Sequence, residues 1–298
     1  MKILLTGRSG QVGWELERCL KPLGEISAPD RASLDLGRPE AVSAAVRSCR
    51  PDLIVNAAAY TAVDQAEREP SSALTVNGES VGVLAYEATR IGALLVHFST
   101  DYVFDGTKRG PYVESDCPAP VNAYGRSKLA GEREIIGSGC RHLILRTSWV
   151  YAMRGSNFVV TMLKLARERP QLRVVNDQIG APTWARDVAS ATLAALRGPK
   201  PVEGLFHVAS GGTTSWYEFA RRVLAVCGLQ TPVVPISTSE YPTAAARPAH
   251  SVLDSSRFEA ATGFRIGPWD ERLEECLRSA AAVSPAGSGA EGEADGAR

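Results

Sequence analysis

The sequence predicts a doubly wound α/β fold, with a parallel sheet and a smaller mixed α/β lobe. In the first half of the 298 residues, short runs that are apolar throughout alternate with longer amphipathic patterns. Such runs are typical of parallel strands in a sheet that helices cover on both faces. After about Tyr151 the pattern becomes mixed and turn residues become denser, which indicates a second, smaller unit.

The first half supplies the elements of the main sheet in a regular order. Pro39 opens one of the helical patterns, where proline is favoured because its missing N–H would have no partner. Crossovers between parallel strands are right-handed, so the helices are expected on both faces of one sheet. The predicted strands of this first domain, residues 1–150, are 2–6, 52–58, 93–99 and 142–147, and its predicted helices are 12–20, 39–49, 71–91 and 124–136.

The second half predicts a substrate-binding lobe over residues 151–282, from which some segments return to the main layer. We expect it over the carboxyl edge of the sheet, where ligands bind in open α/β folds. Residues 283–298 consist mainly of small and polar residues and predict a disordered tail. The predicted helices of the lobe are 157–169, 185–196, 215–227 and 270–280, and its strands are 172–176, 205–209 and 233–236.

Composition excludes several classes of partner. Lys plus Arg and Asp plus Glu both number 33, and the pI is near 6.9, so bulk charge attracts neither nucleic acid nor an anionic membrane. No apolar run is long enough to span a bilayer, and the chain enters its first strand at once, so we expect a cytoplasmic protein. The six cysteines form no C-x-x-C pair, which favours scattered buried thiols over a disulfide frame or a zinc site.

A glycine-rich loop follows the first predicted strand and opens the first helix. Gly7 permits a tight turn, Gly10 lets the backbone approach a pyrophosphate, and Gly13 allows the helix to pack closely on the sheet. The N-terminus of the helix then offers unpaired N–H groups to the phosphates. The loop therefore predicts a Rossmann-type dinucleotide site.

The choice between NADH and NADPH stays open. Asp30 lies about 20 residues after the loop, a spacing at which an acidic residue binds the adenosine ribose. Arg8 and Arg31 could instead face a 2′-phosphate, or simply be solvated surface side chains.

The catalytic prediction rests on Tyr124 and Lys128, which are four residues apart and so share one face of a helix. A phenol has a pKa near 10, and a nearby cation lowers this pKa and favours the phenolate. Thr100, directly after the predicted strand 93–99, supplies a hydroxyl for the oxygen of a substrate carbonyl. His97 lies in the same strand and is expected to be a buried core histidine.

At these residues the chain resembles the extended short-chain dehydrogenase/reductase family. In the related sugar-nucleotide dehydratases an Asp-Glu pair follows the threonine and eliminates water. Here Asp101 is followed by Tyr102, so one carboxylate of that pair is missing. Elimination needs both an acid and a base, so the resemblance implies plain carbonyl reduction.

Further stretches resemble the dTDP-4-dehydrorhamnose reductases within that family, and the resemblance extends to about residue 280. Outside the glycine loop and the Ser99–Phe104 segment, the matching stretches are 56–64, 146–151, 176–183, 211–216 and 247–248. By this resemblance the cofactor is lined by Gly10, Gln11, Val12, Asp30, Asp35, Leu36, Ala59, Tyr60, Thr61, Tyr124 and Lys128, and the sugar nucleotide is contacted by Thr100, Asp101 and Trp149.

Plainer roles compete for some of these residues. Trp149 also fits a core aromatic at a strand end, and Asp30 and Asp35 also fit turn or helix-cap chemistry. Tyr60 stands where some family members carry histidine, which a backbone contact to the cofactor would tolerate.

The resemblance implies transfer of a hydride from NADPH or NADH to the C4 ketone of dTDP-4-dehydro-L-rhamnose, giving dTDP-L-rhamnose for cell-surface polysaccharide. Another sugar-nucleotide reductase or epimerase, or a non-catalytic NADP-binding regulatory subunit, remains as an alternative. Some family members use magnesium held by glutamates at a subunit contact. The resemblance therefore also implies a possible homodimer. Glu271, Glu274 and Glu275 match no such motif, so we assign no metal.

Overall fold

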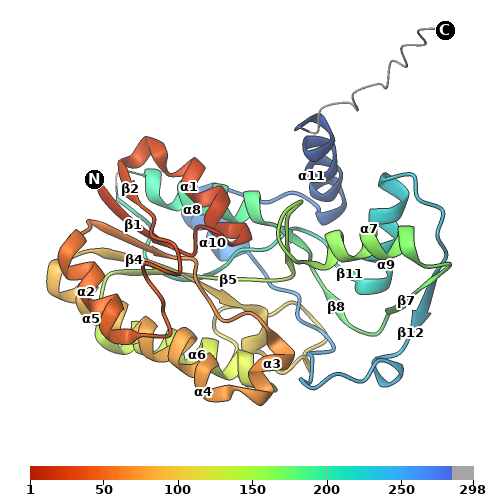
Figure 1. Cartoon of the computed structure of the whole chain (residues 1–298), viewed down its shortest axis with the longest axis horizontal. Helices are drawn as coiled ribbons and strands as arrows, with labels where there is room; N and C mark the ends of the chain where they lie inside the picture. Colours follow the sequence, from red (N-terminus) through yellow and green to blue (C-terminus); the bar gives the residue numbers. More distant parts are fainter. Residues whose placement is uncertain (199, 284–298) are drawn as a thin grey trace, which may run out of the picture.

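The computed structural model describes residues 1–198 and 200–283, and it shows a six-stranded sheet beside a smaller lobe (Figure 1). All five pairings within the sheet are parallel. In spatial order the strands are β10 (Gly204–His207), β5 (His142–Thr147), β4 (Leu94–Thr100), β3 (Leu53–Asn56), β1 (Lys2–Thr6) and β2 (Glu25–Ser27).

The strand order reverses beside β1. The chain passes from β1 outward to the edge strand β2 and then returns to β3 on the other side of β1. Open α/β sheets bind ligands at such a switch point, outside the carboxyl ends of the strands. The topology therefore places a ligand crevice after Thr6 and Asn56, the last residues of β1 and β3.

Helices cover both faces of the sheet (Figure 1). Successive side chains of a strand point to opposite faces, so Ile3 and Leu5 join one apolar cluster and Leu4 joins the other. The first cluster is completed by α1 (Gln11–Cys19), α8 (Ala185–Arg197) and α10 (Ser256–Thr262), and the second by α2 (Pro39–Cys49), α5 (Ser80–Ile91) and α6 (Ala123–Ser138).

The lobe has its own apolar core, in which α7 (Phe158–Glu168), α9 (Trp216–Val226) and α11 (Trp269–Val283) meet. Three short strand pairs frame it. They are β7 (Leu172–Val175) with β12 (Val233–Ile236), β8 (Ile179–Gly180) with β11 (Thr214–Ser215), and β6 (Val150–Tyr151) with β9 (Thr183–Trp184). From the second half of the chain, α8, β10 and α10 belong to the main layer.

The predicted bounds agree with the structure for β1, β5, β12 and α2. The helix predicted over 71–91 is instead three segments: α4 (Pro70–Leu74), a π-helical turn η2 (Thr75–Glu79) and α5. β2, α10 and α3 (Val63–Arg68) were not predicted, because each is short and lacks a periodic apolar pattern. Short 3₁₀ turns complete the fold: η1 (Lys21–Leu23), η3 (Asp101–Val103) and η4 (Thr238–Glu240).

Three predictions about the whole chain can be compared with the structure. Of the predicted tail 283–298, Val283 ends α11 and the rest lies outside the described residues. Among the described residues, no helix combines the length and the apolar character needed to cross a membrane. All six cysteines are free, but only Cys140 and Cys276 are buried, so the expectation of scattered buried thiols was wrong for the other four.

Candidate active site

A cavity of about 710 Å³ opens at the carboxyl ends of β1, β3, β4 and β5. The lobe closes its far side with residues such as Phe158 and Trp216. The structure brings every site residue predicted from the sequence to this one cavity. They are Gly7, Gly10, Gln11, Val12, Asp30, Asp35, Leu36, Ala59, Tyr60, Thr61, Thr100, Asp101, Tyr124, Lys128 and Trp149.

The glycine loop is tightly packed at the start of this cavity. Gly7 has a φ of +75°, which a side chain would strain, and a Cβ there would lie 2.5 Å from the backbone nitrogen of Ala58. A Cβ on Gly13 would lie 2.0 Å from the Gly7 carbonyl oxygen. These two glycines let α1 begin directly behind the loop, with its first turn lining the cavity.

Asp30 and Asp35 accept hydrogen bonds from backbone N–H groups of the loop after β2. Asp30 accepts a hydrogen bond from Ser33 N at 2.9 Å, and Asp35 accepts one from Gly37 N at 2.9 Å. No side chain caps the N-terminus of α2, so the helix-cap role considered for Asp35 was wrong. Both residues still line the cavity, because the turns that they hold form its wall.

The π-helical turn η2 fixes the segment after β3. Asn77 accepts the Tyr60 N–H at 2.9 Å and donates to the Tyr60 carbonyl at 3.0 Å. The same Asn77 amide donates to Ser127 Oγ on α6 at 2.9 Å. Single π turns inside helices are frequent at functional sites, and this one ties the wall around Tyr60 to the helix that carries Tyr124.

Helix α6 presents Tyr124 and Lys128. Asn122 caps the helix by accepting the Gly125 N–H at 2.8 Å. A Cβ on Gly125 would lie 2.1 Å from the Tyr102 carbonyl oxygen, so only glycine lets α6 approach η3 this closely. The tight contact brings Tyr124 next to the end of β4, where its ring centroid lies 5.8 Å from that of Tyr102.

Burial dominates the ionisation of this site. It raises the pKa of Tyr124 to about 12, against a smaller lowering by the Thr100 side chain. Burial also raises the pKa of Asp101 to about 7 and lowers the pKa of Lys128 to about 8, the latter against the charge of Glu132. The expected lowering of the Tyr124 pKa by Lys128 was wrong, because desolvation of the buried phenol raises this pKa.

The Thr100 hydroxyl makes two hydrogen bonds. It donates to Asp101 Oδ1 at 3.0 Å and accepts the Tyr102 N–H at 3.1 Å. Asp101 Oδ2 has no partner, although the residue is only 2% exposed.

Unpaired buried polar atoms gather around the cavity. Buried polar groups are normally hydrogen-bonded, so such exceptions need an explanation. Of the ten found among the described residues, five belong to residues that line this cavity: Ser99, Asp101, Thr147, Tyr151 and Arg154. This set fits a ligand rich in hydroxyl, carbonyl or phosphate groups.

The lobe contributes two residues that were not predicted, Trp216 and Asn157. The predicted Trp149 has a φ of +46° and stacks on Trp216, with ring centroids 3.5 Å apart. A Cβ on Gly180 would lie 2.4 Å from the Trp149 ring, so that glycine makes room for the stack. Asn157 donates to Gln11 Oε1 at 3.0 Å and so joins the lobe to the glycine loop. No local pattern reveals these contacts, because both join segments far apart in the sequence.

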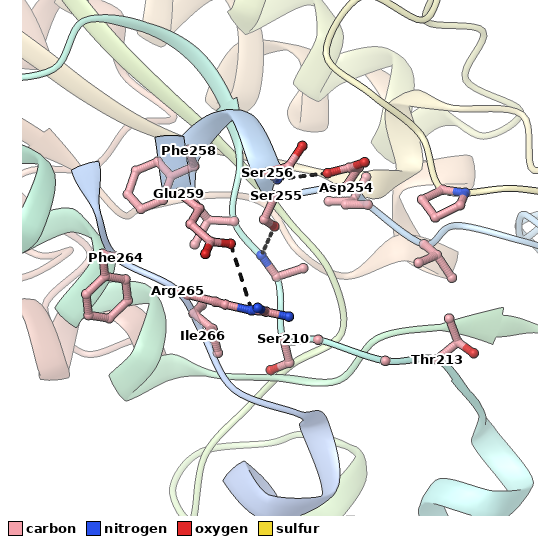
Figure 2. Close-up of a pocket in the computed structure, with 17 residues that line it drawn as sticks. Ser210, Thr213, Asp254, Ser255, Ser256, Phe258, Glu259, Phe264, Arg265 and Ile266 are labelled. Atoms are coloured by element: carbon pink, nitrogen blue, oxygen red, sulfur yellow. Dashed lines mark hydrogen bonds and ion pairs between the residues drawn. The ribbon is translucent and has the colours of Figure 1, made fainter. Parts of the chain in front are cut away.

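A second cavity, of about 280 Å³, lies between the end of β10 and α10 (Figure 2). An ion pair between Arg265 and Glu259, 3.8 Å apart, lies within it. None of the predicted site residues lines this cavity. The larger cavity is therefore the candidate active site.

Two of the three glutamates considered for magnesium are paired with arginines. Glu274 pairs with Arg222, and Glu275 pairs with Arg272. Within residues 1–198 and 200–283 no group of three or more His, Cys, Asp and Glu side chains could hold a metal ion. The residues present do not fit a magnesium site within one chain.

Comparisons with known proteins agree with this geometry. The family model described as the RmlD substrate binding domain matches residues 1–282. A dTDP-4-dehydrorhamnose reductase of Burkholderia thailandensis is 48% identical over 293 residues, covering 93% of this chain and 98% of that protein. One from Escherichia coli K12 is 46% identical over 290 residues, covering 93% and 97%.

A solved structure gives the same result. The crystal structure of dTDP-4-dehydrorhamnose reductase from Bacillus anthracis in complex with NADP has a TM-score of 0.89 and 36% identity, and the match covers 93% of this chain and 99% of that one. With this much of both chains aligned, the chain belongs to the dTDP-4-dehydrorhamnose reductase family.

Proposed function

We propose that this protein reduces the C4 ketone of dTDP-4-dehydro-L-rhamnose to give dTDP-L-rhamnose, a precursor of cell-surface polysaccharide, with NADPH as the reductant. The observation that carries the proposal is that Thr100, Tyr124 and Lys128 line the same cavity as the glycine loop. A dinucleotide and a carbonyl substrate can therefore meet within one enclosed space.

The cofactor would be held at the switch point of the sheet. The glycine loop and the first turn of α1 offer backbone N–H groups to its pyrophosphate. Arg8 lies at the adenosine end beside Asp30, where its guanidinium suits a 2′-phosphate. When bound, NADPH supplies the hydride.

Tyr124 acts as the proton donor to the forming alkoxide. A pKa raised to about 12 keeps its phenol protonated at neutral pH, which is the form that a donor requires. A well-placed general acid is worth roughly 10²–10⁴ in rate. Lys128, four residues along α6, stabilises the phenolate that remains after the transfer.

Thr100 and Asp101 complete the carbonyl site. The Thr100 hydroxyl donates to Asp101 Oδ1, so its proton is already engaged. With a pKa of about 7, Asp101 carries a proton part of the time near neutral pH. When that proton lies on Oδ1, Asp101 donates to Thr100, and the threonine hydroxyl is released to donate to the substrate carbonyl.

The sugar nucleotide would be bound between the main domain and the lobe. The stacked rings of Trp149 and Trp216 offer an apolar wall, while the unpaired oxygens of Ser99 and Thr147 suit sugar hydroxyls.

We accordingly assign residues 1–150 mainly to cofactor binding and 151–282 mainly to substrate binding. We place the reaction in the cytoplasm, which the six free cysteines support. A homodimer stays a prediction, which the mass of the protein in solution tests.

One experiment tests the reaction and its rivals together. The purified protein is given dTDP-4-dehydro-L-rhamnose with NADPH or NADH, and the product is identified by NMR. We expect one NADPH consumed per dTDP-L-rhamnose formed. An epimerase would convert a sugar nucleotide without net consumption, and a regulatory subunit would bind NADPH without turnover, so either result would contradict the proposal.

A further inference from the structure

A row of polar side chains crosses the sheet beneath α6. Thr6 on β1 is in register with Asn56 on β3, which is in register with His97 on β4. Each is at most 2% exposed. Two residues earlier on each strand, the same face carries apolar residues, namely Leu4, Ile54 and Leu95. The sheet therefore changes from apolar to polar where it meets the active site.

These side chains form a continuous set of hydrogen bonds that ends on Lys128. Thr6 Oγ1 lies 2.6 Å from Asn56 Oδ1, and Asn56 Nδ2, the other end of the same amide, lies 3.1 Å from His97 Nδ1. The other ring nitrogen, Nε2, lies 3.1 Å from Lys128 Nζ. Lys128 is itself only 2% exposed, and the His97 imidazole lies next to its ammonium group.

We propose that His97 is a positioning residue, which holds the Lys128 ammonium group in place while Asn56 and Thr6 fix the imidazole from behind. The inference rests on the proposed function, since that gives Lys128 its role. The row leads from Lys128 into the sheet, where Thr6 Oγ1 also accepts the Ala58 N–H at 3.4 Å. It therefore orients the lysine and offers no path for protons to solvent.

The hydrogen-bonding capacity of imidazole makes the arrangement specific. Burial and the charge of Lys128 hold the pKa of His97 well below its usual value, so the ring is neutral and has one donor and one acceptor. An ammonium group can only donate, so Nε2 must accept from Lys128 and Nδ1 must carry the proton. The Asn56 amide must then have the reverse of the orientation given above, so that its oxygen accepts from Nδ1–H and its nitrogen donates to Thr6 Oγ1. The charge of Lys128 thus fixes both the tautomer of His97 and the orientation of the amide.

Removal of the imidazole should therefore change the proton affinity of Lys128. A hydrogen bond from a charged donor is about twice as strong as a neutral one, so the ammonium form loses more than the amine form. Substitution of His97 leaves in place the other titratable groups on the elements around Lys128. They are Tyr124 and Glu132 on α6, Arg146 on β5, which pairs with Glu132 at 2.6 Å, and Asp101 after β4.

Two isosteric variants separate the contacts of the ring. In His97→Gln the amide takes the place of Nε2 and retains the contact to Lys128. In His97→Asn the amide takes the place of Nδ1 and retains only the contact to Asn56. A purely structural histidine would be replaced equally well, or equally badly, by both.

The first readout does not depend on activity. NMR of protein labelled at lysine Cε follows the ionisation of Lys128, one of six lysines, and Lys128→Met identifies its signal. We expect His97→Asn to lower the pKa of Lys128 by about one unit, and His97→Gln to leave it nearly unchanged. In the wild-type protein, imidazole ¹⁵N shifts at neutral pH should report the proton of His97 on Nδ1. An unmoved lysine pKa in His97→Asn, or a wild-type proton on Nε2, overturns the inference.

Turnover provides the second readout. We expect kcat of His97→Asn to fall about tenfold or more, with its alkaline limb at lower pH, while His97→Gln stays within a few-fold of wild type. In a Lys128→Met background, His97→Asn should cost nothing further. A further loss there would show that His97 acts independently of Lys128. If wild type itself does not reduce the keto sugar, the proposed function fails, whereas the NMR results still decide the role of His97.

Discussion

Asp101 shows how one buried side chain can link ionisation to catalysis. It follows the last residue of β4, it is 2% exposed, and one of its oxygens has no partner. Because burial disfavours its charged form, its pKa is raised to about 7. The carboxyl that borders the proposed carbonyl site is therefore costly to ionise in the folded protein.

This cost should appear as a pH-dependent stability. The folded state binds the Asp101 proton more tightly than the unfolded state, whose pKa is 3.8, so the free energy of unfolding falls as pH rises from about 4 to about 7. Asp101→Asn lacks the ionisable group. We expect the wild type to lose up to roughly 4 kcal/mol relative to the variant over that range. Urea denaturation at several pH values measures this, and parallel curves for the two proteins would contradict the raised pKa.

At the scale of single elements, α6 organises the site through its glycines. Gly125 and Gly131 lie against neighbouring backbone, and a Cβ on either would come within 2.2 Å of a carbonyl oxygen, of Tyr102 and Asn77 respectively. Gly137, near the end of the same helix, has open space around the position of its Cβ. The backbone of the helix thus lies against neighbouring backbone around Tyr124 and Lys128, and has room at Gly137.

Gly131→Ala and Gly137→Ala form a matched pair. Alanine favours helix over glycine by about 0.8–1.0 kcal/mol, so Gly137→Ala should be stabilising. In Gly131→Ala the new methyl group meets the Asn77 carbonyl, and overpacking of this kind costs typically 1–3 kcal/mol. Thermal denaturation of both variants measures the difference. If Gly131→Ala were as stable as Gly137→Ala, the close packing of α6 on η2 would be disproved.

At the scale of the whole molecule, the main domain and the lobe together enclose the cavity. Asn157 joins the two at the glycine loop. Asn157 at the start of α7 donates to Gln11, and it also accepts the Val160 N–H as the helix cap. A dinucleotide held at the loop would therefore be bordered by both parts.

Cofactor binding should stabilise the fold accordingly. A ligand present at 100 times its dissociation constant adds about 2.7 kcal/mol to the free energy of unfolding. We expect NADPH to raise the melting temperature in a dose-dependent way, and Asn157→Ala to melt lower through loss of a cap worth about 1 kcal/mol. Calorimetry with and without NADPH tests both statements. A melting temperature indifferent to NADPH would contradict the cofactor site.

The sequence predicted the fold class and the region of the site because the signals are local. Apolar runs located β1 and β5, the glycine spacing located the start of α1, and the four-residue spacing placed Tyr124 and Lys128 on one helical face. Each depends on neighbours within one turn or one strand.

What the sequence did not predict depends on burial and on distant contacts. The stack of Trp149 on Trp216 joins β5–β6 to α9, and the contact of His97 with Lys128 joins β4 to α6. The direction of the Tyr124 pKa shift was also missed, because the depth of burial is a property of the whole fold. The three-residue strand β2 carried no pattern to detect.

The central claim is that the Tyr124 hydroxyl is the acid of a carbonyl reduction, and Tyr124→Phe tests it most directly. Tyr102→Phe, whose ring lies edge-on to that of Tyr124, is the matched control for loss of a phenolic hydroxyl. With NADPH and dTDP-4-dehydro-L-rhamnose, we expect kcat of Tyr124→Phe to fall by roughly 10²–10⁴, while NADPH still raises its melting temperature and Tyr102→Phe stays near wild type. If Tyr124→Phe kept more than about a tenth of wild-type kcat, the assigned acid would be wrong.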